Sequence, residues 1–463
     1  MSGGTFDFDN DAAGGTNFAE NVGALNILAG ANTVRSDRAT TNQTTTLTFA
    51  QLNGPATSAG ATLNFTGDGT GIGDDTRNRI VFTTPPTIPA GNNSLIGGWA
   101  FVNGSDFAIY NSTGTISVRA AQAADYQTGS ETTWNFNQNA APAADVTTTA
   151  SRNVNALKLG DGIDITMAPT HTLNIELGGI VKSGTNASIF RGGSLTAGDT
   201  SAQNLYVFTS TGLTLDTDIV NNGGGGVVGL VKSGGSTLTL TGVNSYTGGT
   251  FLNEGTLIIN SDARLGASSS ALHLRGGTLQ VAAGTTGVPS VRPITLARSV
   301  TINDAGGTLD VGTANTVIID GTLSGSGDRG TLGLVKAGGG TLVLAGNNTF
   351  TAPVTISAGI LSISADANLG VAPTTEVGDW LTLNGGTLNT TASFTLNANR
   401  GVNVATNSTL DVATGTVLNI GGVLTGTANV TKTSNGLLNF QQADASGLAL
   451  LAARKRQPGR LSQ

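Results

Sequence analysis

The chain has 463 residues, and only 11% of them are charged, well below the ~25% of a typical soluble domain. Its formal net charge of −7 argues against nucleic acid binding through a broad basic face, and its lack of cysteine excludes disulfides and thiolate metal sites. Glycine supplies 68 residues, and most of the rest are Thr, Ser, Asn and aliphatic residues, which indicates many short strands joined by tight turns.

The first 150 residues predict an irregular β-rich segment. Short runs at 62–65, 79–82, 107–110 and 115–118 are interpreted as strands, and residues 138–150 form a polar, Ala-rich connector. Two interpretations stay open, namely irregular coils of the same repetitive body as the rest of the chain, or a small β domain packed on its end. No export signal is visible at the amino terminus, and no apolar run approaches the ~20 residues of a membrane helix.

Two acidic clusters in this segment are weak candidates for a calcium site, because Ca²⁺ prefers oxygen ligands. No complete calcium-loop spacing follows them, so solvated turn acids are the plainer interpretation. The same holds for the pairs Asp161 with Asp164 and Asp216 with Asp218, and no other metal or cofactor is predicted. The cluster residues are Asp7, Asp9, Asp11, Asp74 and Asp75.

An internal repeat follows, in which residues 229–266 return as 333–370 without a gap, at an offset of 333 − 229 = 104. Of the six lysines in the chain, four lie at one point of the unit, namely Lys182, Lys232, Lys336 and Lys432. Asn244 and Asn348 are expected at a turn where the side chain bonds the backbone. The predicted anchors of the repeat are Gly229, Lys232, Asn244, Tyr246 and Gly255 in one copy, and Gly333, Lys336, Asn348, Phe350 and Gly359 in the other.

Within the unit, strands such as 237–240, 256–259 and 278–281 alternate polar and apolar residues and are separated by Gly-Gly turns. Like strands lie near 20 residues apart, a spacing that fits one coil of a solenoid whose stacked strands bury an aliphatic ladder. The sequence therefore predicts an all-β chain with a parallel β-solenoid over residues 151–436, a less regular N-terminal part and few helices.

The string GLVKxGGGTLxLxGxNxYTGGT resembles the autotransporter-associated β-strand repeat of bacterial secreted passenger domains. The resemblance implies a right-handed parallel β-helix on the cell surface, outside the cell or associated with the outer membrane, acting as a structural or adhesive scaffold and not as an enzyme. Glycans or neighbouring surface proteins are the implied partners. Members of that family end in an outer-membrane barrel, and the expectation here is a chain without one.

The last stretch, residues 437–463, departs from the repeat and is basic, with four of the 22 positive residues between Arg454 and Arg460. A truncated gene, a frameshift or a short sorting tail each accounts for this departure, and disorder is one expectation for it. Together with the missing export signal, it leads to the hypothesis that the chain is a fragment of a longer protein.

Three functions stay open from the sequence. The first is a structural or adhesive surface protein, the second a polysaccharide-degrading β-helix enzyme of the lyase or glycosidase kind, and the third a passive stalk of a larger protein. An enzyme needs carboxylates converging on one face, and no such pair repeats here. His171 and His273 lie on different predicted coils, and residues 223–226 are a glycine loop without the helix that a phosphate cradle needs. No catalytic residue is predicted.

Overall fold

The computed structural model describes residues 1–10, 17–38, 43–67, 72–73, 77–88, 94–282, 293–325, 333–441 and 450–452. Within these ranges the chain is all-β and contains no α-helix, as expected. The helical elements are short 3₁₀ turns, namely η1 (Thr57–Ala59), η2 (Ala123–Asp125), η3 (Glu131–Thr133), η4 (Asp262–Arg264) and η5 (Asp366–Leu369). The chain divides into two compact units, Met1–Leu279 and Gln280–Gln463.

The N-terminal part of the first unit is a stack of parallel coils that ends in antiparallel strands. Gly4 pairs with Asn32 and Ala31 with Thr62 in parallel strands, whereas the last three strands, within residues 100–120, pair antiparallel with one another. We call residues 1–120 the N-terminal stack. Its strands are β1 (Gly4–Asn10), β4 (Ala31–Arg38), β7 (Thr62–Gly67), β9 (Ala100–Val102), β10 (Asp106–Asn111) and β11 (Ser117–Ala120) in one sheet, with β2 (Phe18–Val22), β5 (Thr45–Phe49), β8 (Asn78–Phe82), β3 (Leu25–Asn26) and β6 (Leu52–Asn53) in two others.

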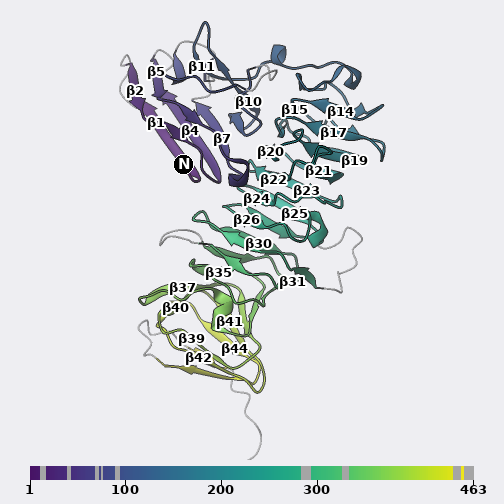
Figure 1. Ribbon diagram of the computed structural model, residues 1–463. Helices are drawn as coiled ribbons and strands as arrows, with labels where there is room; N and C mark the ends of the chain where they lie inside the picture. The colour runs from purple at the N-terminus through teal and green to yellow at the C-terminus, as the bar shows by residue number, and fades with distance from the viewer. Residues whose placement is uncertain are drawn as a thin grey trace, which may run out of the picture. The chain divides into compact units, whose positions relative to one another are not determined.

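The rest of the first unit is a parallel β-solenoid in which consecutive coils add strands to two sheets (Figure 1). The sheet that we call the covered sheet holds β12 (Asn139–Ala140), β15 (Ala156–Leu159), β18 (Gly179–Lys182), β20 (Gln203–Thr209), β22 (Val228–Ser233), β24 (Thr250–Leu252) and β26 (Leu272–Leu274). The other sheet holds β13 (Val146–Thr147), β16 (Ile165–Thr166), β19 (Ser188–Ala197), β21 (Leu213–Ile219), β23 (Thr237–Leu240), β25 (Thr256–Ile259) and β27 (Thr278–Val281). β17 (Thr172–Ile175) also pairs with β19, and β14 (Arg152–Val154) pairs with β17.

Strand patterns differ between the two sheets because only one has both faces buried. β23 and β25 alternate partly exposed and buried residues, as their Thr-Leu alternation predicts. Every residue of β18 and β22 is buried. Val181 and Val231, which alternate with the interior residues of these strands, pack with Phe101 and Phe107 of the N-terminal stack. The N-terminal stack therefore covers the outer face of the covered sheet.

A short loop of the N-terminal stack fixes this contact. Gly60 has a φ of +51°, and a Cβ at this position would lie 2.3 Å from Cγ of Phe251, so only glycine fits against the ring. The Asn253 amide donates to Gly60 O at 2.9 Å, and the Asn204 amide donates to Thr57 O at 2.6 Å. These bonds join residues up to 193 positions apart in the sequence.

The second unit is also built from parallel coils. Its interior carries an aliphatic ladder in which Leu342, Leu361, Leu388 and Leu410 are register partners on successive strands, all buried. One sheet holds β28 (Ile294–Leu296), β31 (Thr316–Ile319), β34 (Thr341–Leu344), β36 (Ile360–Ile363), β38 (Thr387–Thr390), β41 (Ser408–Val412), β44 (Val430–Thr433) and β46 (Leu450–Ala452). The next holds β30 (Gly307–Val311), β33 (Leu334–Ala337), β35 (Val354–Ile356), β37 (Val377–Asn384), β40 (Arg400–Thr406) and β43 (Leu424–Gly426). β29 (Val300–Ile302) pairs with β32 (Leu323–Ser324), and a three-stranded sheet holds β39 (Phe394–Leu396), β42 (Val417–Ile420) and β45 (Leu437–Phe440). The predicted β-solenoid fold is confirmed.

Candidate functional site

The repeated lysine lies inside the solenoid, where backbone carbonyls surround its ammonium group. Lys232 Nζ donates to Ser233 O at 2.9 Å, Gly234 O at 2.6 Å and Glu254 O at 3.1 Å, and the residue is fully buried. Three donors thus meet three acceptors, which satisfies the ammonium completely. We call this arrangement of one lysine with the carbonyls of its own turn and the next coil a lysine cage.

The second repeat copy builds the same cage. Lys336 Nζ donates to Ala337 O at 2.6 Å, Gly338 O at 2.8 Å and Ala358 O at 3.1 Å. Burial lowers the pKa of Lys336 to about 8 and that of Lys232 to about 7, while Glu254 acts to raise the pKa of Lys232. Lys182 and Lys432 each donate to two carbonyls, and Lys432 is partly exposed.

The other predicted anchors link neighbouring coils. Asn244 accepts from Ile219 N at 2.7 Å and donates to Arg264 O at 2.6 Å, while Asn348 accepts from Leu323 N at 2.9 Å and donates to Asn368 O at 2.6 Å. In each copy the partners lie 25 residues before and 20 residues after the asparagine. The side chain therefore joins three successive coils.

Rings and glycines occupy the remaining anchor positions. Tyr246 and Phe350 are fully buried. Gly229 faces the Asn204 side chain, and a Cβ at Gly229 would lie 2.4 Å from Asn204 Oδ1. Gly333, Gly255 and Gly359 have φ values of +51°, +66° and +61°, which disfavour any larger residue. These anchors hold the fold, and none of them faces a pocket described below.

The acidic candidates are not brought together into a metal site where the structure describes them. Asp7 pairs with Arg35 at 3.2 Å across β1 and β4, and Asp9 lies in the same strand β1. Asp11, Asp74 and Asp75 lie outside the described residues. Among the described residues, no group of three or more His, Asp or Glu side chains is placed to hold a metal ion.

The other acids cap turns of the next coil. Asp161 accepts from the backbone N–H groups of Thr185 at 2.7 Å and Asn186 at 2.5 Å, and these bonds lower the pKa of its carboxyl. Asp164 accepts from Ile189 N, Asp218 accepts from Val243 N, and the Asp216 side chain accepts from the Thr241 hydroxyl. A carboxylate used in this way is a structural acceptor.

The two histidines lie on different coils. Nδ1 of His171 is 2.9 Å from the Thr148 hydroxyl. His273 stacks on Phe251 with ring centroids 4.5 Å apart, and burial together with Arg275 lowers its pKa to about 4. The residues 223–226 form a loop between β21 and β22.

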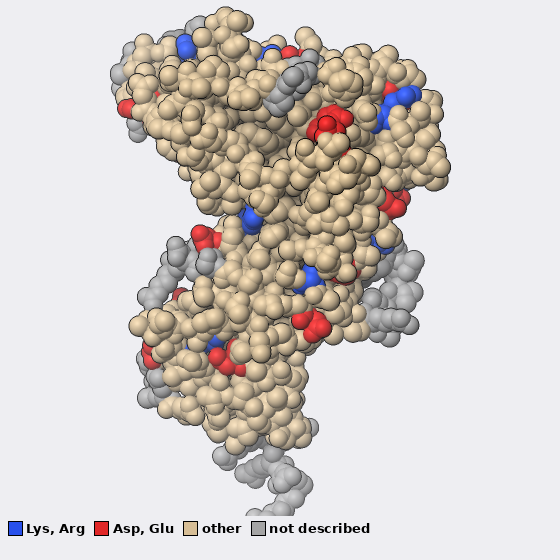
Figure 2. All heavy atoms as spheres, viewed as in Figure 1, with Lys and Arg blue, Asp and Glu red and all other residues tan. Residues whose placement is uncertain are grey.

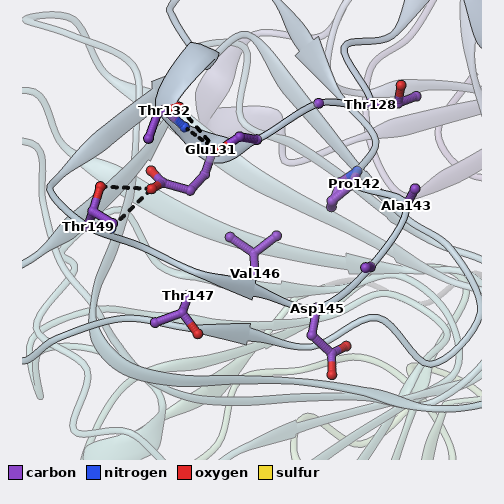
Figure 3. Close-up of a pocket in the computed structure, with 12 residues that line it drawn as sticks. Thr128, Glu131, Thr132, Pro142, Ala143, Asp145, Val146, Thr147 and Thr149 are labelled. Carbon is purple, nitrogen blue, oxygen red and sulfur yellow. Dashed lines mark hydrogen bonds between the residues drawn. The ribbon is translucent and has the colours of Figure 1, made fainter.

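Residues 121–138 join the N-terminal stack to the solenoid, and from here on this segment, and not the expected 138–150, is called the connector. A pocket of about 430 Å³ lies between the connector and the first solenoid coil (Figure 3). Its lining is rich in hydroxyl groups and carries two carboxylates, Glu131 and Asp145. The 3₁₀ turn η3 and the strand β13 position these groups. In Figure 3, Val146 points into the space between the two walls, and the Asp145 carboxylate points away from Glu131.

The carboxylates of this pocket are already engaged. Glu131 accepts from the hydroxyl of Thr149 at 2.8 Å and from its N–H at 3.2 Å, and it also pairs with Arg152. The Arg152 hydrogen bond lowers the pKa of Glu131, so the carboxyl stays ionised and is not available as a general acid. Asp145 accepts from Asp164 N at 2.9 Å. The pocket offers hydroxyl hydrogen bonding and does not favour the polysaccharide-degrading alternative.

Sequence reasoning did not single out this pocket, because its residues do not recur at the repeat period. The signal available was local: Ser130 and Glu131 begin a polar stretch, and the Ser130 hydroxyl accepts from Thr132 N at the start of η3. The ion pair of Glu131 with Arg152 spans 21 residues, a separation that no local sequence pattern indicates.

The surface is poor in charge, and Figure 2 shows Lys, Arg, Asp and Glu scattered singly or in small groups among uncharged residues. In the part of the chain that the structure describes, no helix is long and apolar enough to cross a membrane. Recognition at such a surface depends on hydrogen bonds and apolar contacts more than on long-range charge.

The parallel β-solenoid carries a lysine cage in each repeat copy, and a comparison with known protein families matches the same two segments. Residues 230–259 and 334–363 match the family model described as Passenger-associated-transport-repeat, and each match contains one fully caged lysine, Lys232 or Lys336. The predicted resemblance to autotransporter passenger repeats is thereby confirmed.

One curated relative is the "Adhesin BmaC autotransporter" of Brucella suis biovar 1 (strain 1330), which is 41% identical over 157 residues. The matched region is 34% of this chain and 4% of that relative, so the chain spans a small part of the relative's length. No solved structure gives a significant match.

Proposed function

We propose that this chain is an adhesive segment of an autotransporter-type passenger, displayed at the bacterial cell surface or outside the cell. The observation that carries the proposal is the 41% identity over 157 residues to a protein named as an autotransporter adhesin. The passenger-associated repeats and the β-solenoid fold support it, because stacked coils hold side chains at fixed spacings along a rigid surface.

The surface chemistry supports glycans or other uncharged surface polymers as the partners. Hydroxyl and amide groups with few charges offer many directional hydrogen bonds and little long-range attraction. The engaged carboxylates of Glu131 and Asp145 support a binding role over a hydrolytic one.

The test is adhesion of beads that carry the purified chain to surfaces coated with polysaccharides or with host extracellular proteins, with analysis of released sugars on the same plates. Beads that carry an unrelated acidic protein of similar net charge are the control. Adhesion without released oligosaccharide is expected. Released oligosaccharide would overturn the proposal in favour of an enzyme, and absence of adhesion on every surface would favour a passive stalk.

A further inference from the structure

An exposed aromatic side chain projects from the connector beside the first solenoid coil. Phe136 is 57% exposed, although the turn that carries it is well fixed. Asn135 Oδ1 accepts from Asn137 N at 3.0 Å, and Asn135 O accepts from Gln138 N at 3.0 Å. Gln138 O in turn accepts from Asn155 N at 2.7 Å, which ties the turn to the solenoid. The exposed ring therefore stands on a fixed backbone turn, which reduces the ordering that ligand binding requires.

The ring borders a hollow of about 330 Å³ whose other walls come from successive coils, at Asn155, Glu176, Leu177, Asp199 and Gln203. We call this hollow the Phe136 groove. Coil stacking fixes its walls, since Leu177 N donates to Asn155 O at 2.9 Å and Gln203 N donates to Val227 O at 2.9 Å. Its volume lies at the lower end of the roughly 300–1,000 Å³ of small-ligand sites.

Glycine keeps the floor of the groove open. Gly198 has a φ of +72°, and a Cβ there would lie 2.7 Å from Cβ of Gln203. Gly178 also has a φ of +72°, and a Cβ there would lie 1.7 Å from the backbone oxygen of Asn204, so glycine is needed for the next coil to stack beside it. Gly198 therefore sets where the Gln203 side chain lies.

Polar groups in the groove have bonding capacity left over among the described residues. Glu176 accepts from Asn174 through Oε1 only, at 2.7 Å. Asp199 accepts from the N–H groups of Thr200 and Ser201 and from the Thr200 hydroxyl, all through Oδ1. The side-chain amide of Gln203 makes no hydrogen bond to any described residue. Three acceptor oxygens (Glu176 Oε2, Asp199 Oδ2 and Gln203 Oε1) and the two N–H donors of the Gln203 amide remain, a set that matches the hydroxyl groups of a sugar ring.

The charge of the groove restricts which sugar fits. Burial raises the pKa of Glu176, and the Asp199 carboxyl in the same hollow adds a smaller effect in the same direction. Among the described residues that line the groove, none is basic. An acidic sugar would therefore meet like charge, whereas a neutral or amino sugar would not.

We propose that the Phe136 groove binds a neutral or amino sugar ring of a polysaccharide, with a C–H face of the ring on Phe136 and its hydroxyls bonded to Glu176, Asp199 and Gln203. Weakly positive C–H groups suit the negative face of an aromatic ring. This assignment rests on the proposed adhesive function and names the class of ligand and the place where it binds.

The experiment is titration of the full chain with soluble neutral, N-acetylated amino and uronic acid oligosaccharides, followed by ligand-observed NMR and calorimetry. Phe136→Ala and Gln203→Ala are compared with Phe440→Ala, which truncates another exposed phenylalanine, 37% exposed, in the second unit. Neutral or amino oligosaccharides are expected to bind. Phe136→Ala is expected to weaken binding about five- to tenfold, with Phe440→Ala unchanged. Circular dichroism and melting temperature should not change in any variant.

Several outcomes separate the possibilities. Equal affinity of the wild type and Phe136→Ala, or preference for uronic acid ligands, overturns the assignment. Calcium binding that Glu176→Gln abolishes and Phe136→Ala leaves intact shows a cation site and overturns it as well. If adhesion survives Phe136→Ala and Gln203→Ala, the assignment of sugar binding to the groove is wrong but the adhesive function stands. If sugar binds in the groove but the beads do not adhere, the assignment stands and the adhesive function is wrong.

Discussion

The two copies of the repeat share a sequence but lie in different surroundings. The segment GLVK forms β22 in the first unit, where every strand residue is buried, and β33 in the second, where buried and partly exposed residues alternate. Val231 is fully buried, because the N-terminal stack covers its face, whereas Val335 is partly exposed. The interior of the repeat is therefore constant, and its outer face is free to acquire a partner.

The outer residues diverge accordingly. Phe251 contacts the N-terminal stack in the first copy, and its register partner His273 stacks on it. The corresponding register pair in the second copy is Thr355 with Thr382. The lysine cage, by contrast, keeps the same three types of carbonyl acceptor in both copies. The two copies therefore share the interior residues that form a coil and differ in the residues on its outer face.

The largest effect is expected from Gly255→Ala and Gly359→Ala. A Cβ at either glycine would lie 2.4 Å from two backbone oxygens, and both residues have a positive φ. Each variant should lose about 3 kcal/mol or more of the free energy of unfolding. Chemical denaturation measures this, with Gly235→Ala as the control, since a Cβ at Gly235 meets nothing within 4 Å. A loss in one copy only would break the equivalence of the two coils.

Low pH should destabilise the chain through His273, which pairs with Phe251 of the first repeat copy. The folded pKa of His273 is about 4, below the ordinary value of 6.5. As the pH falls, His273 is protonated in the unfolded chain before it is protonated in the folded chain. The stability that comes from the neutral, buried imidazole is therefore complete above pH 6.5 and is lost as the pH falls through 4. The shift corresponds to at most about 3 kcal/mol.

Denaturation of the wild type and His273→Gln at pH 7, 5.5 and 4.5 measures this contribution. The wild type should lose more stability than the variant, because only the wild type carries the imidazole. Parallel pH curves for the two proteins would show that His273 is not the group responsible.

Removing the cage ammonium should have a smaller effect that is similar in both copies. Lys232→Met and Lys336→Met keep the apolar stem but leave buried carbonyls with fewer donors, at an expected loss of about 1–3 kcal/mol each. Lys432→Met is the matched control, because Lys432 is partly exposed and bonds two carbonyls, and its loss should stay within about 0.5 kcal/mol. Unequal losses at Lys232 and Lys336 would show that the surroundings of the cage, namely the covering stack or Glu254, contribute to its stability.

The smallest effect is expected from Glu254→Ala. Glu254 accepts from Gly234 N at 3.0 Å and acts to raise the pKa of Lys232, but the second copy has Ala358 at this position and still forms its cage. A loss of no more than about 1 kcal/mol is expected by thermal denaturation. A larger loss would mean that the first cage depends on the carboxylate, and Glu254→Gln would then separate charge from hydrogen bonding.

The solenoid was predictable from the sequence because its determinants repeat. Alternation in 237–240 and 256–259, the offset of 104 and the recurring lysine all point to stacked coils, and β23, β25 and the lysine cages occur at those residues. The carbonyl acceptors of the lysines were not predictable, since backbone groups carry no sequence signature.

The docking of the N-terminal stack and the two pockets could not be predicted. Gly60 contacts Phe251 across 191 positions, and the Phe136 groove combines a connector turn with three later coils. Such contacts depend on the register in which coils stack, and single positions such as Phe136 or Gln203 carry no periodic signal. The acidic candidates Asp7 and Asp9 illustrate the converse, because proximity in sequence indicated a cluster and the fold pairs Asp7 with Arg35.

The lysine cages also bear on how the chain withstands proteolysis. Trypsin-like enzymes need a lysine side chain on an extended, accessible backbone, and the ammonium groups of Lys232 and Lys336 are sealed inside their coils. Cleavage at these residues requires the coil to open first, so its rate follows the local opening free energy and not the number of basic residues. The chain has few basic residues, and at two of them a trypsin-like protease can cleave only after the coil has unfolded locally.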